Sequence, residues 1–300
     1  MKPEFNFGKA KKYLLFTLLP LFSTYIQLVS FSSCQKTSVE ADNIMVFDSI
    51  PTVKKLNPAV NEISGIADSK RNPGYIWGQE DSGHPPQLCL IKHDGTLVKR
   101  IYIKGASNRD WEDMTLAGNE IFIAETGDNA QTYTEYGFYK FPEPALTTDT
   151  VIGAQKIRFR YADGSHDAEA FLVDPDSKEI YIITKRDKPS RLYKIAYPYS
   201  FTDVNTAELV ASLPYSGVVG AAISADGKEI IIKTYPALFY YTRKPGESVE
   251  QSIQKEYTKL AYKMEPMGEA VTFAADNSGF FTLSEKGFGS SVNLYFYKRK

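Results

Sequence analysis

The sequence predicts an all-β protein, organised as a β-propeller of five four-stranded blades and closed by an N-terminal strand. Three observations favour this fold. Strand-like runs recur along the chain at intervals of 50 or 57 residues, and each interval holds further β runs separated by turn residues. The last interval lacks a fourth strand, while a spare strand lies near the N-terminus. A β-rich repeat of this length is typical of propellers, whose blades are four-stranded sheets around an axis.

Four of the five recurring runs open on a glutamate, and the remaining one opens on a valine. The runs begin at Glu62, Glu112, Glu169, Val219 and Glu269. In a propeller the first strand of each blade lines the central channel. Equivalent positions of successive blades converge on one axis, so we expect the four glutamates to lie near one mouth of that channel.

The N-terminus is predicted to be a targeting segment rather than part of the fold. Residues 1–33 combine a basic start with an apolar stretch from Tyr13 to Phe31, which is typical of a signal peptide. Ser32-Ser33 directly before Cys34 resembles a bacterial lipoprotein cleavage box, and would make Cys34 the lipid-carrying first mature residue. Residues 34–45 are polar and predict a tether. The alternatives are an ordinary secreted protein and a membrane-spanning helix, although a proline and a glutamine interrupt the apolar run.

The amino-acid composition argues against several classes of function. There are two cysteines, and lipidation of Cys34 leaves only Cys89, so neither a disulfide framework nor a cysteine-based metal site is expected. Removal of residues 1–33 takes away four lysines and one glutamate, which moves the formal net charge from −1 to −4. The charge is close to balance and the sequence has no basic stripe, which argues against a nucleic-acid partner. Residues 46–300 suit one large domain, which we expect to be monomeric.

The strands of the first four repeats follow from runs of β-forming residues and from turns such as Asp94-Gly95 and Asp226-Gly227. The first repeat predicts strands over residues 62–67, 75–78, 87–91 and 97–103. The later repeats predict strands over residues 112–117, 120–125, 136–141 and 155–161, then 169–173, 179–185, 191–197 and 207–213, then 219–224, 229–233, 237–243 and 259–263.

The fifth repeat predicts how the ring closes. It supplies strands over residues 269–274, 279–284 and 292–298, and then the chain ends. We expect residues 46–50 to supply the missing fourth strand, because pairing the two ends removes exposed sheet edges. Six blades are the alternative, if the long segments 126–156 or 244–258 contain further strands. A helical turn is also expected in the second of these segments.

The glutamates predict a charged channel mouth, because Asp110, Asp113 and Asp167 lie within two residues of them in the sequence. Carboxylates crowded in a partly dry channel repel one another, so some must be protonated or meet a cation. Oxygen ligands suit Ca²⁺, and Glu62, Glu112, Glu169 and Glu269 are the candidate ligands. Two structural alternatives remain open. A salt-bridge ring could form with Lys185, Arg186 and Lys233, or the acids could bond to backbone amides.

The ends of the second strands predict a polar binding surface at the same mouth. The residues there, taken as matching positions, are Glu80, Glu125, Lys185, Lys233 and Glu285. Two of the following loops, residues 80–84 and 125–129, carry Asp81, Asp128 and Asn129 beside a glycine. Such oxygen-rich loops could bind Ca²⁺ or a polar ligand, although Asp and Asn also stabilise ordinary turns. Trp111 is expected to form an apolar wall of this mouth.

Signatures of nucleophilic catalysis are scarce in the sequence. It has no Gly-x-Ser-x-Gly elbow, no Gly-rich phosphate loop and no His-Glu-x-x-His. Among the three histidines, His166 is the candidate general acid or base because it lies next to Asp167, although an exposed loop histidine is the simpler interpretation. The candidate catalytic residues are Glu112, Asp113, His166 and Glu169.

Several short motifs resemble two related families, the SdiA-regulated (YjiK-like) propellers and the esterase-like domain of phytase. The motifs are Glu62-Ile63-Ser64-Gly65-Ile66, Asp110-Trp111-Glu112-Asp113-Met114, Gly127-Asp128-Asn129, His166-Asp167-Ala168-Glu169-Ala170 and Gly268-Glu269-Ala270. The resemblance spans most of residues 46–298. It implies a secreted β-propeller with Ca²⁺ in an acidic channel, but it does not imply one reaction. Val219 departs from the pattern and leaves the acidic ring open on one side.

Two functional hypotheses follow. The first is a lipid-anchored binding or scaffold propeller of the bacterial cell envelope, facing the periplasm or the cell surface, whose acidic mouth holds Ca²⁺, a small polar ligand or a protein partner. The second is a Ca²⁺-assisted hydrolase of phosphate or other esters, in which metal-bound water attacks. The first is favoured because a phosphatase is expected to present a basic mouth, whereas acids outnumber bases here.

Overall fold

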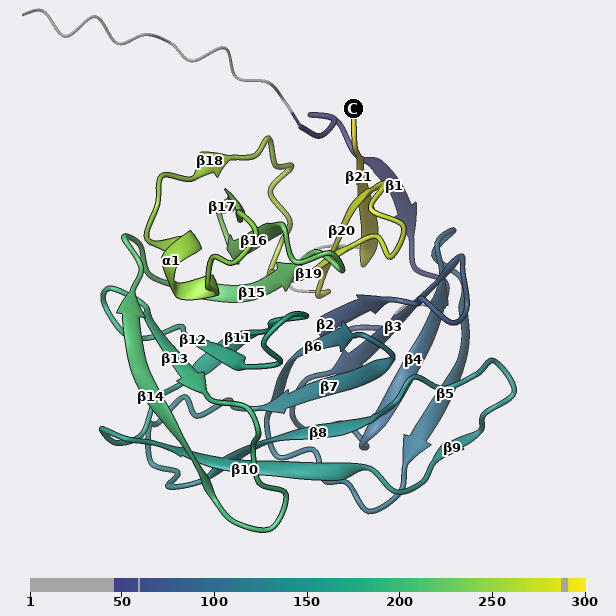
Figure 1. Ribbon diagram of the computed structural model, residues 1–300. Coiled ribbons are helices and arrows are strands. Elements are labelled where there is room, and N and C mark those ends of the chain that lie inside the picture. Colours follow the sequence, from purple (N-terminus) through teal and green to yellow (C-terminus); the bar gives the residue numbers. More distant parts are fainter. Residues whose placement is uncertain (1–45, 59, 287–290) are drawn as a thin grey trace, which may run out of the picture. The chain divides into compact units, whose positions relative to one another are not determined.

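The computed structural model describes residues 46–300, except residues 59 and 287–290. The predicted signal peptide (residues 1–33), Cys34 and the tether up to residue 45 lie outside the described residues. The described chain is almost entirely β-structure, with one short helix, α1 (Val249–Ile253) (Figure 1). Within it, no helix has the length and apolar character needed to cross a membrane.

The strands are arranged in four sheets, and each sheet follows the order of the chain almost without interruption. The first sheet has the order β2 (Ile63–Asp68), β3 (Tyr75–Glu80), β4 (Gln87–Lys92), β5 (Leu97–Ile103) and β9 (Thr150–Val151). The eight-stranded sheet consists of β6 (Trp111–Ala117), β7 (Glu120–Glu125), β8 (Tyr136–Pro142) and β10 (Gln155–Tyr161), joined to β14 (Asn205–Ser212), β13 (Arg191–Ile195), β12 (Ile180–Thr184) and β11 (Ala168–Val173).

The other two sheets have four strands each. The β15 sheet has the order β15 (Val218–Ile223), β16 (Glu229–Thr234), β17 (Ala237–Thr242) and β18 (Thr258–Lys259). The closing sheet has the order β19 (Gly268–Phe273), β20 (Gly279–Ser284), β21 (Asn293–Lys298) and β1 (Thr52–Lys55).

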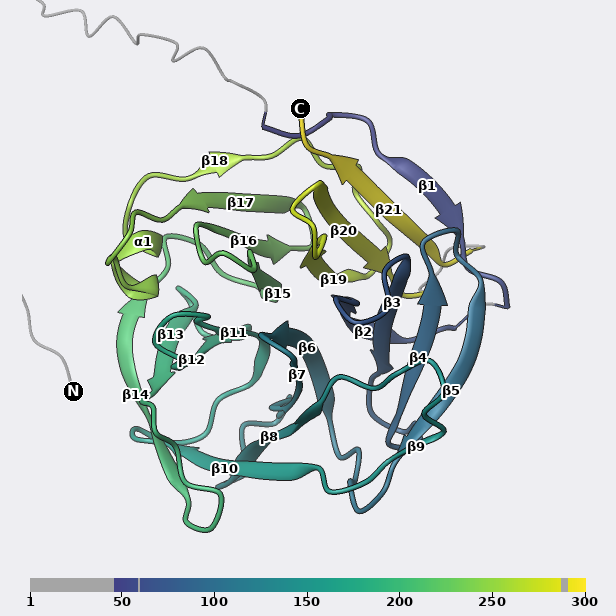
Figure 2. The ribbon, with the colours of Figure 1, turned by 45° about the vertical axis from the view of Figure 1, so that its right-hand side comes forward.

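Five inner strands form a ring, as Figure 2 shows. The strands β2, β6, β11, β15 and β19 contact one another in this order, and β19 contacts β2. Their residues are mostly buried, whereas the outer strand β10 alternates between buried Ile157, Phe159 and Tyr161 and more exposed basic residues. The two patterns differ because an inner strand is buried on both faces, whereas an outer strand is buried on one face only. The result is a β-propeller-like fold, and the predicted all-β class is confirmed.

The two ends of the chain pair, but not at the predicted residues. Strand β1 pairs antiparallel with β21, with Thr52 opposite Phe296. In the predicted segment 46–50, Phe47 forms only an isolated bridge with Arg299, and its ring packs edge-on against Phe280 at 4.9 Å. Pro51 follows, and because proline has no N–H to donate to a ladder, the continuous strand begins only after it.

Neither of the two long segments, residues 126–156 and 244–258, forms an additional sheet. The first segment contributes β9, which extends the first sheet by pairing parallel to β5. The second contains α1, whose Ser248 accepts a hydrogen bond from the Gln251 N–H in a capping box. The turn of helix expected between residues 244 and 257 is confirmed.

Glycine permits a close contact between two of the inner strands. A Cβ atom on Gly65 of β2 would lie 2.5 Å from the backbone nitrogen of Met114 in β6. Backbone cannot move aside as a side chain can, so the ring of inner strands tolerates no side chain here. Gly78 in β3 differs, because its Cβ would lie 3.3 Å from side-chain atoms of Ile63, and the nearest backbone atom, the Gly65 carbonyl oxygen, would lie at an ordinary contact distance of 3.7 Å.

We expect Gly65→Ala to lower the free energy of unfolding by about 1–3 kcal/mol, because the methyl group must push β2 away from β6. Gly78→Ala is the matched control and should cost less. Urea unfolding followed by tryptophan fluorescence measures both. Equal losses for the two variants would show that the contact between β2 and β6 is not a close constraint.

Candidate functional site

Each inner strand begins with an irregularity that turns one or two residues out of the ladder. The residues concerned are Ser64, Glu112 with Asp113, Glu169, Val219 and Glu269. Bulges of this kind re-aim side chains and are common next to active sites. The predicted equivalence of Glu62 with the other glutamates is therefore wrong, because Ser64 takes that position in β2. The Glu62 side chain is 52% exposed and its Oε2 lies 3.4 Å from Nδ1 of His84.

Each inner strand pairs with a second strand, and the residues at the ends of these second strands occupy equivalent positions. The set of equivalent residues differs from the predicted one. The strand ends that pair with the starts of the inner strands are Glu80, Glu125, Thr184, Thr234 and Ser284. One residue further lie Asp81, Thr126, Lys185, Tyr235 and Glu285. Lys233 instead lies one residue before its strand end, which places it in a different register from Lys185.

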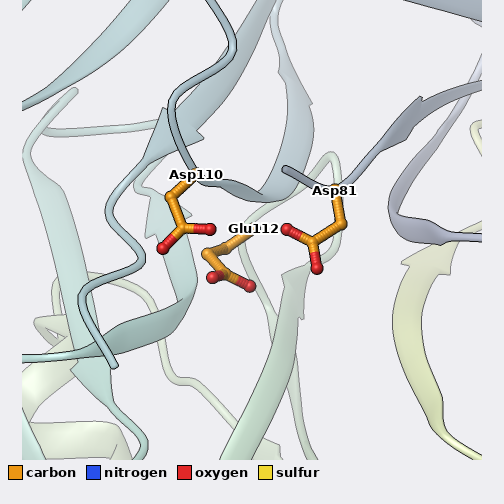
Figure 3. Close-up of side chains that lie close together, drawn as sticks. All are labelled: Asp81, Asp110 and Glu112. Carbon is orange, nitrogen blue, oxygen red and sulfur yellow. The ribbon is translucent and has the colours of Figure 1, made fainter. Parts of the chain in front are cut away.

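Carboxyl groups from neighbouring sheets meet at the start of the inner strands. Asp81, Asp110 and Glu112 each offer an oxygen atom within 4.8 Å of the others, and their side chains converge in Figure 3. Glu112, Asp167 and Glu169 form a second group within the same limit. We call these five residues the acidic cluster. Glu112 belongs to both groups, so it links a half-exposed group to a buried one.

Burial and mutual repulsion raise the pKa values of three cluster residues, Asp110, Glu112 and Glu169. Burial raises the pKa of Glu112 well above its usual range, and the Glu169 carboxylate adds to this shift. Burial and the nearby Glu269 raise the pKa of Glu169 in the same way. Asp110 is also raised, by burial and by Asp81. The cluster therefore takes up protons readily, or a cation in their place.

The pKa values of three neighbouring residues, Glu269, Glu285 and Asp113, are raised as well. Burial raises the pKa of Glu269, although the Tyr235 hydroxyl, which donates to its Oε1 at 2.5 Å, lowers it. Burial and Glu269 raise the pKa of Glu285 to about 8. Asp113 lies deeper, and burial raises its pKa well above the usual range although the Met114 N–H donates to its Oδ1 at 2.8 Å.

Two cations neutralise part of this charge. The Lys185 ammonium donates to Glu169 Oε1 and lies 3.8 Å from Oε1 of Glu269. The Arg186 Nε lies 2.9 Å from Asp167 Oδ2. The predicted salt-bridge ring therefore forms in part, but Lys233 does not belong to it. Lys233 is fully buried and donates to Glu265 Oε2 at 2.8 Å, between the β15 sheet and the closing sheet.

Two buried oxygen atoms of the cluster, Oδ2 of Asp167 and Oε2 of Glu169, lack a hydrogen-bond partner among the described residues. The first lies 2.9 Å from Arg186 Nε, whereas Glu169 meets its cation through the other oxygen, Oε1. Glu169 is 4% exposed, and its Oε2 is buried without a donor, while Oε1 meets Lys185. Beside the cluster, a Cβ on Gly127 would meet the carboxyl groups of Glu112 and Asp110, so a side chain there would displace these groups. Carboxylate oxygens alone, close together and partly without donors, are a donor set that suits a hard cation such as Ca²⁺.

Other predicted binding residues have internal partners. Glu80 is buried and its Oε2 accepts from Gln87 Nε2 at 3.3 Å, while Glu125 pairs with Lys156. Burial alone would raise the pKa of Asp128, but the amides of Thr132 and Tyr133 lower it below the usual range. Asn129 accepts a hydrogen bond from Arg186. These residues hold the loops that surround the cluster.

The structure corrects the expectations for Trp111 and His166. Trp111 is fully buried and its ring packs on Tyr139 at 5.7 Å, so it belongs to the core instead of an open wall of the mouth. His166 is buried, not exposed. Its Nδ1 lies 3.0 Å from Asp187 Oδ2 and its Nε2 lies 2.8 Å from the Tyr193 hydroxyl.

Sequence reasoning assigned no role at the site to Tyr235, Ser64 or Gly127, although Ser64 and Gly127 lie in the quoted motifs. Tyr235 could have been found from the repeat, because it follows the β16 strand as Lys185 follows β12. Ser64 required knowledge of the bulge, and it accepts a hydrogen bond from Gln79 Nε2 at 2.8 Å. Nothing in the sequence around Gly127 indicates its closeness to Glu112, since 15 residues separate them.

Comparison with known proteins gives no family. No family model matches the sequence, and no curated protein matches it significantly. Among solved structures, the chain is similar to hydrazine synthase of Kuenenia stuttgartiensis, with 12% identity and a TM-score of 0.42 over 79% of this chain and 71% of the other. It is also similar to an auxiliary nutrient binding protein of Bacteroides thetaiotaomicron, with 8% identity and a TM-score of 0.47 over 84% and 73% of the two chains. Such weak likenesses carry no statement about function.

The raised pKa of Glu285 predicts how stability depends on pH without added cation. The unfolded state loses this proton near pH 4.5, whereas the folded state keeps it up to about pH 8. The stabilisation that the shift contributes is thus complete below pH 4.5 and is lost as pH rises to 8. We expect the melting temperature in chelator to fall over this interval, and Glu285→Gln to reduce the fall.

Asp149→Asn is the control, because the side chain of Asp149 is 91% exposed. Melting curves followed by circular dichroism between pH 4 and pH 8 measure the effect. A pH dependence that is the same in Glu285→Gln, Asp149→Asn and the unmodified protein would contradict this account of Glu285.

Proposed function

We propose that this protein is a lipid-anchored β-propeller of the bacterial cell envelope that binds Ca²⁺ through the acidic cluster and presents the site to a polar ligand or protein partner. In this proposal the first sheet, the two halves of the eight-stranded sheet, the β15 sheet and the closing sheet are five blades. The parallel pairing of β10 with β14 then joins two blades at their outer edges.

The unpaired oxygen of Glu169 is the observation that carries the cation site. An oxygen atom buried without a donor costs free energy, and a bound cation would remove that cost. Glu112, Asp167 and Glu169 would hold the ion on the buried side, and Asp81 and Asp110 would face solvent. A bound Ca²⁺ supplies positive charge and coordination positions that a polar ligand can share.

The remaining parts of the proposal rest on the sequence. The basic and apolar run before Cys34 supports export and lipid attachment. A lipid on Cys34 would hold the protein at a membrane through residues 35–45. A propeller tethered in this way could face the periplasm or the cell surface.

Ca²⁺ should stabilise the protein against heat, because a ligand that binds only the folded state shifts unfolding by mass action. At a Ca²⁺ concentration about 100 times the dissociation constant we expect the melting temperature to rise by roughly 5–10 °C relative to chelator. Glu169→Gln should abolish this rise. Differential scanning fluorimetry of the purified protein measures both.

Glu62→Gln is the matched control, because Glu62 is an acid of the same loop region that lies outside the acidic cluster. It should keep the Ca²⁺ response. No rise at millimolar Ca²⁺ would remove the cation site, and a rise lost in Glu62→Gln but kept in Glu169→Gln would place it elsewhere.

An ester hydrolase remains the second function to test, although the cluster does not favour it. Eight carboxyl groups lie in or beside the cluster against the two paired cations Lys185 and Arg186. An anionic ester would meet repulsion unless bound metal reversed it. Turnover of 4-nitrophenyl phosphate or 4-nitrophenyl acetate that requires Ca²⁺ and is lost in Glu169→Gln would establish the hydrolase instead of the binder.

A further inference from the structure

A second site lies at the seam where the ring closes. A cavity of about 420 Å³ separates the closing sheet from the first sheet. Its residues include Thr52 and Lys54 of β1, so the cavity is complete only when the N-terminal strand has paired with β21. Cavities of this size commonly take small molecules.

The floor of the cavity is apolar and aromatic. Phe296 and Leu294 of β21 lie opposite Thr52 and Lys54 in the strand register, so all four side chains share one face of the closing sheet. The Phe296 ring lies 4.6 Å from the ring of Phe281 in β20. These side chains form a surface that suits a flat apolar group.

The wall of the cavity comes from turns of the first sheet. Its central residue is His93, whose ring packs against Phe281 at 4.7 Å. The Nε2 atom of His93 lies 2.7 Å from Oδ1 of Asp68, and Asp68 Oδ2 also accepts a hydrogen bond from the Ala275 N–H at 2.8 Å. The imidazole is therefore held in place from both sides.

The carboxylates that line the cavity accept hydrogen bonds from neighbouring groups, whereas the two lysines that line it form no ion pair within the described residues. Besides Asp68, Asp276 accepts from the Ser278 N–H at 2.9 Å, and the Ser69 hydroxyl donates to Glu143. Lys54 and Lys70 line the cavity, and neither forms an ion pair with an acid in the part of the chain that the structure describes. The cavity thus offers donors to a ligand and needs acceptors from it.

We propose that this cavity binds a small organic anion with a flat apolar body, such as an aromatic carboxylate. The apolar body rests on Phe281 and Phe296, and the anionic group meets Lys54 from the closing sheet and Lys70 from the first sheet. A ligand that contacts both sheets links the two ends of the chain and stabilises the closed ring. The site is separate from the acidic cluster and does not depend on Ca²⁺.

Isothermal titration calorimetry with 2-naphthoate tests the proposal on the purified full chain. We expect saturable binding of 2-naphthoate, at least tenfold weaker binding of 2-naphthalenemethanol, which lacks the charge, and no detectable binding of acetate, which lacks the ring. Lys54→Met and Lys70→Met should each weaken binding about fivefold, since methionine keeps the chain length but not the charge.

Lys104→Met removes an exposed lysine outside the cavity and should bind 2-naphthoate as the unmodified protein does. Glu169→Gln should do the same, so loss of the Ca²⁺ site and loss of this site are told apart. Melting curves of each variant confirm folding. No binding of 2-naphthoate at millimolar concentration, equal binding of the alcohol, or unchanged binding in both Lys54→Met and Lys70→Met would overturn the proposal.

Discussion

The pairing of β1 with β21 brings the first and last strands of the described chain into one sheet. The contact of β19 in that sheet with β2 closes the ring of inner strands. Inner strands in this ring approach one another so closely that Gly65 has no room for a side chain toward β6. Because the strands start at the same end, the side chains at their starts are confined to one small area. Both candidate sites depend on this closure: the acidic cluster lies at the strand starts, and the aromatic cavity lies at the seam.

Confinement explains the electrostatics of the acidic cluster. Glu112 and Glu169 would be solvated on an open surface, but here they are buried beside other carboxyl groups, so their pKa values rise. Lys185, Arg186 and Tyr235 relieve part of the repulsion through direct contacts. They leave Oε2 of Glu169 without a donor among the described residues, and this uncompensated oxygen is the basis of the proposed cation site. The cluster combines a structural charge ring with a candidate metal site, so the two interpretations of the glutamates are not exclusive.

Much of the fold could be predicted from the sequence, because strand periodicity and turn chemistry are local. The strands β5, β7, β10 and β20 have the predicted bounds, and most others differ by one or two residues. The errors occur where local signals compete with longer-range geometry. The two-residue strand β9 has too few residues to show a pattern. The bulge at Ser64 displaces Glu62 from the ring although both belong to one motif, because a single inserted residue changes the direction of the following side chains.

The sequence by itself determined the all-β class, the repeat and the glutamates at three of the five inner-strand starts, since these follow from patterns within each repeat. Only the tertiary structure decided which charges meet. Lys185 and Lys233 look alike in the sequence, yet Lys185 pairs with Glu169 in the cluster and Lys233 is buried against Glu265. The seam cavity could not be foreseen either, because Lys54 and Lys70 face the same space only after β1 has crossed to the last sheet. Contacts between sheets depend on how the ring closes, and closure joins residues more than 200 positions apart.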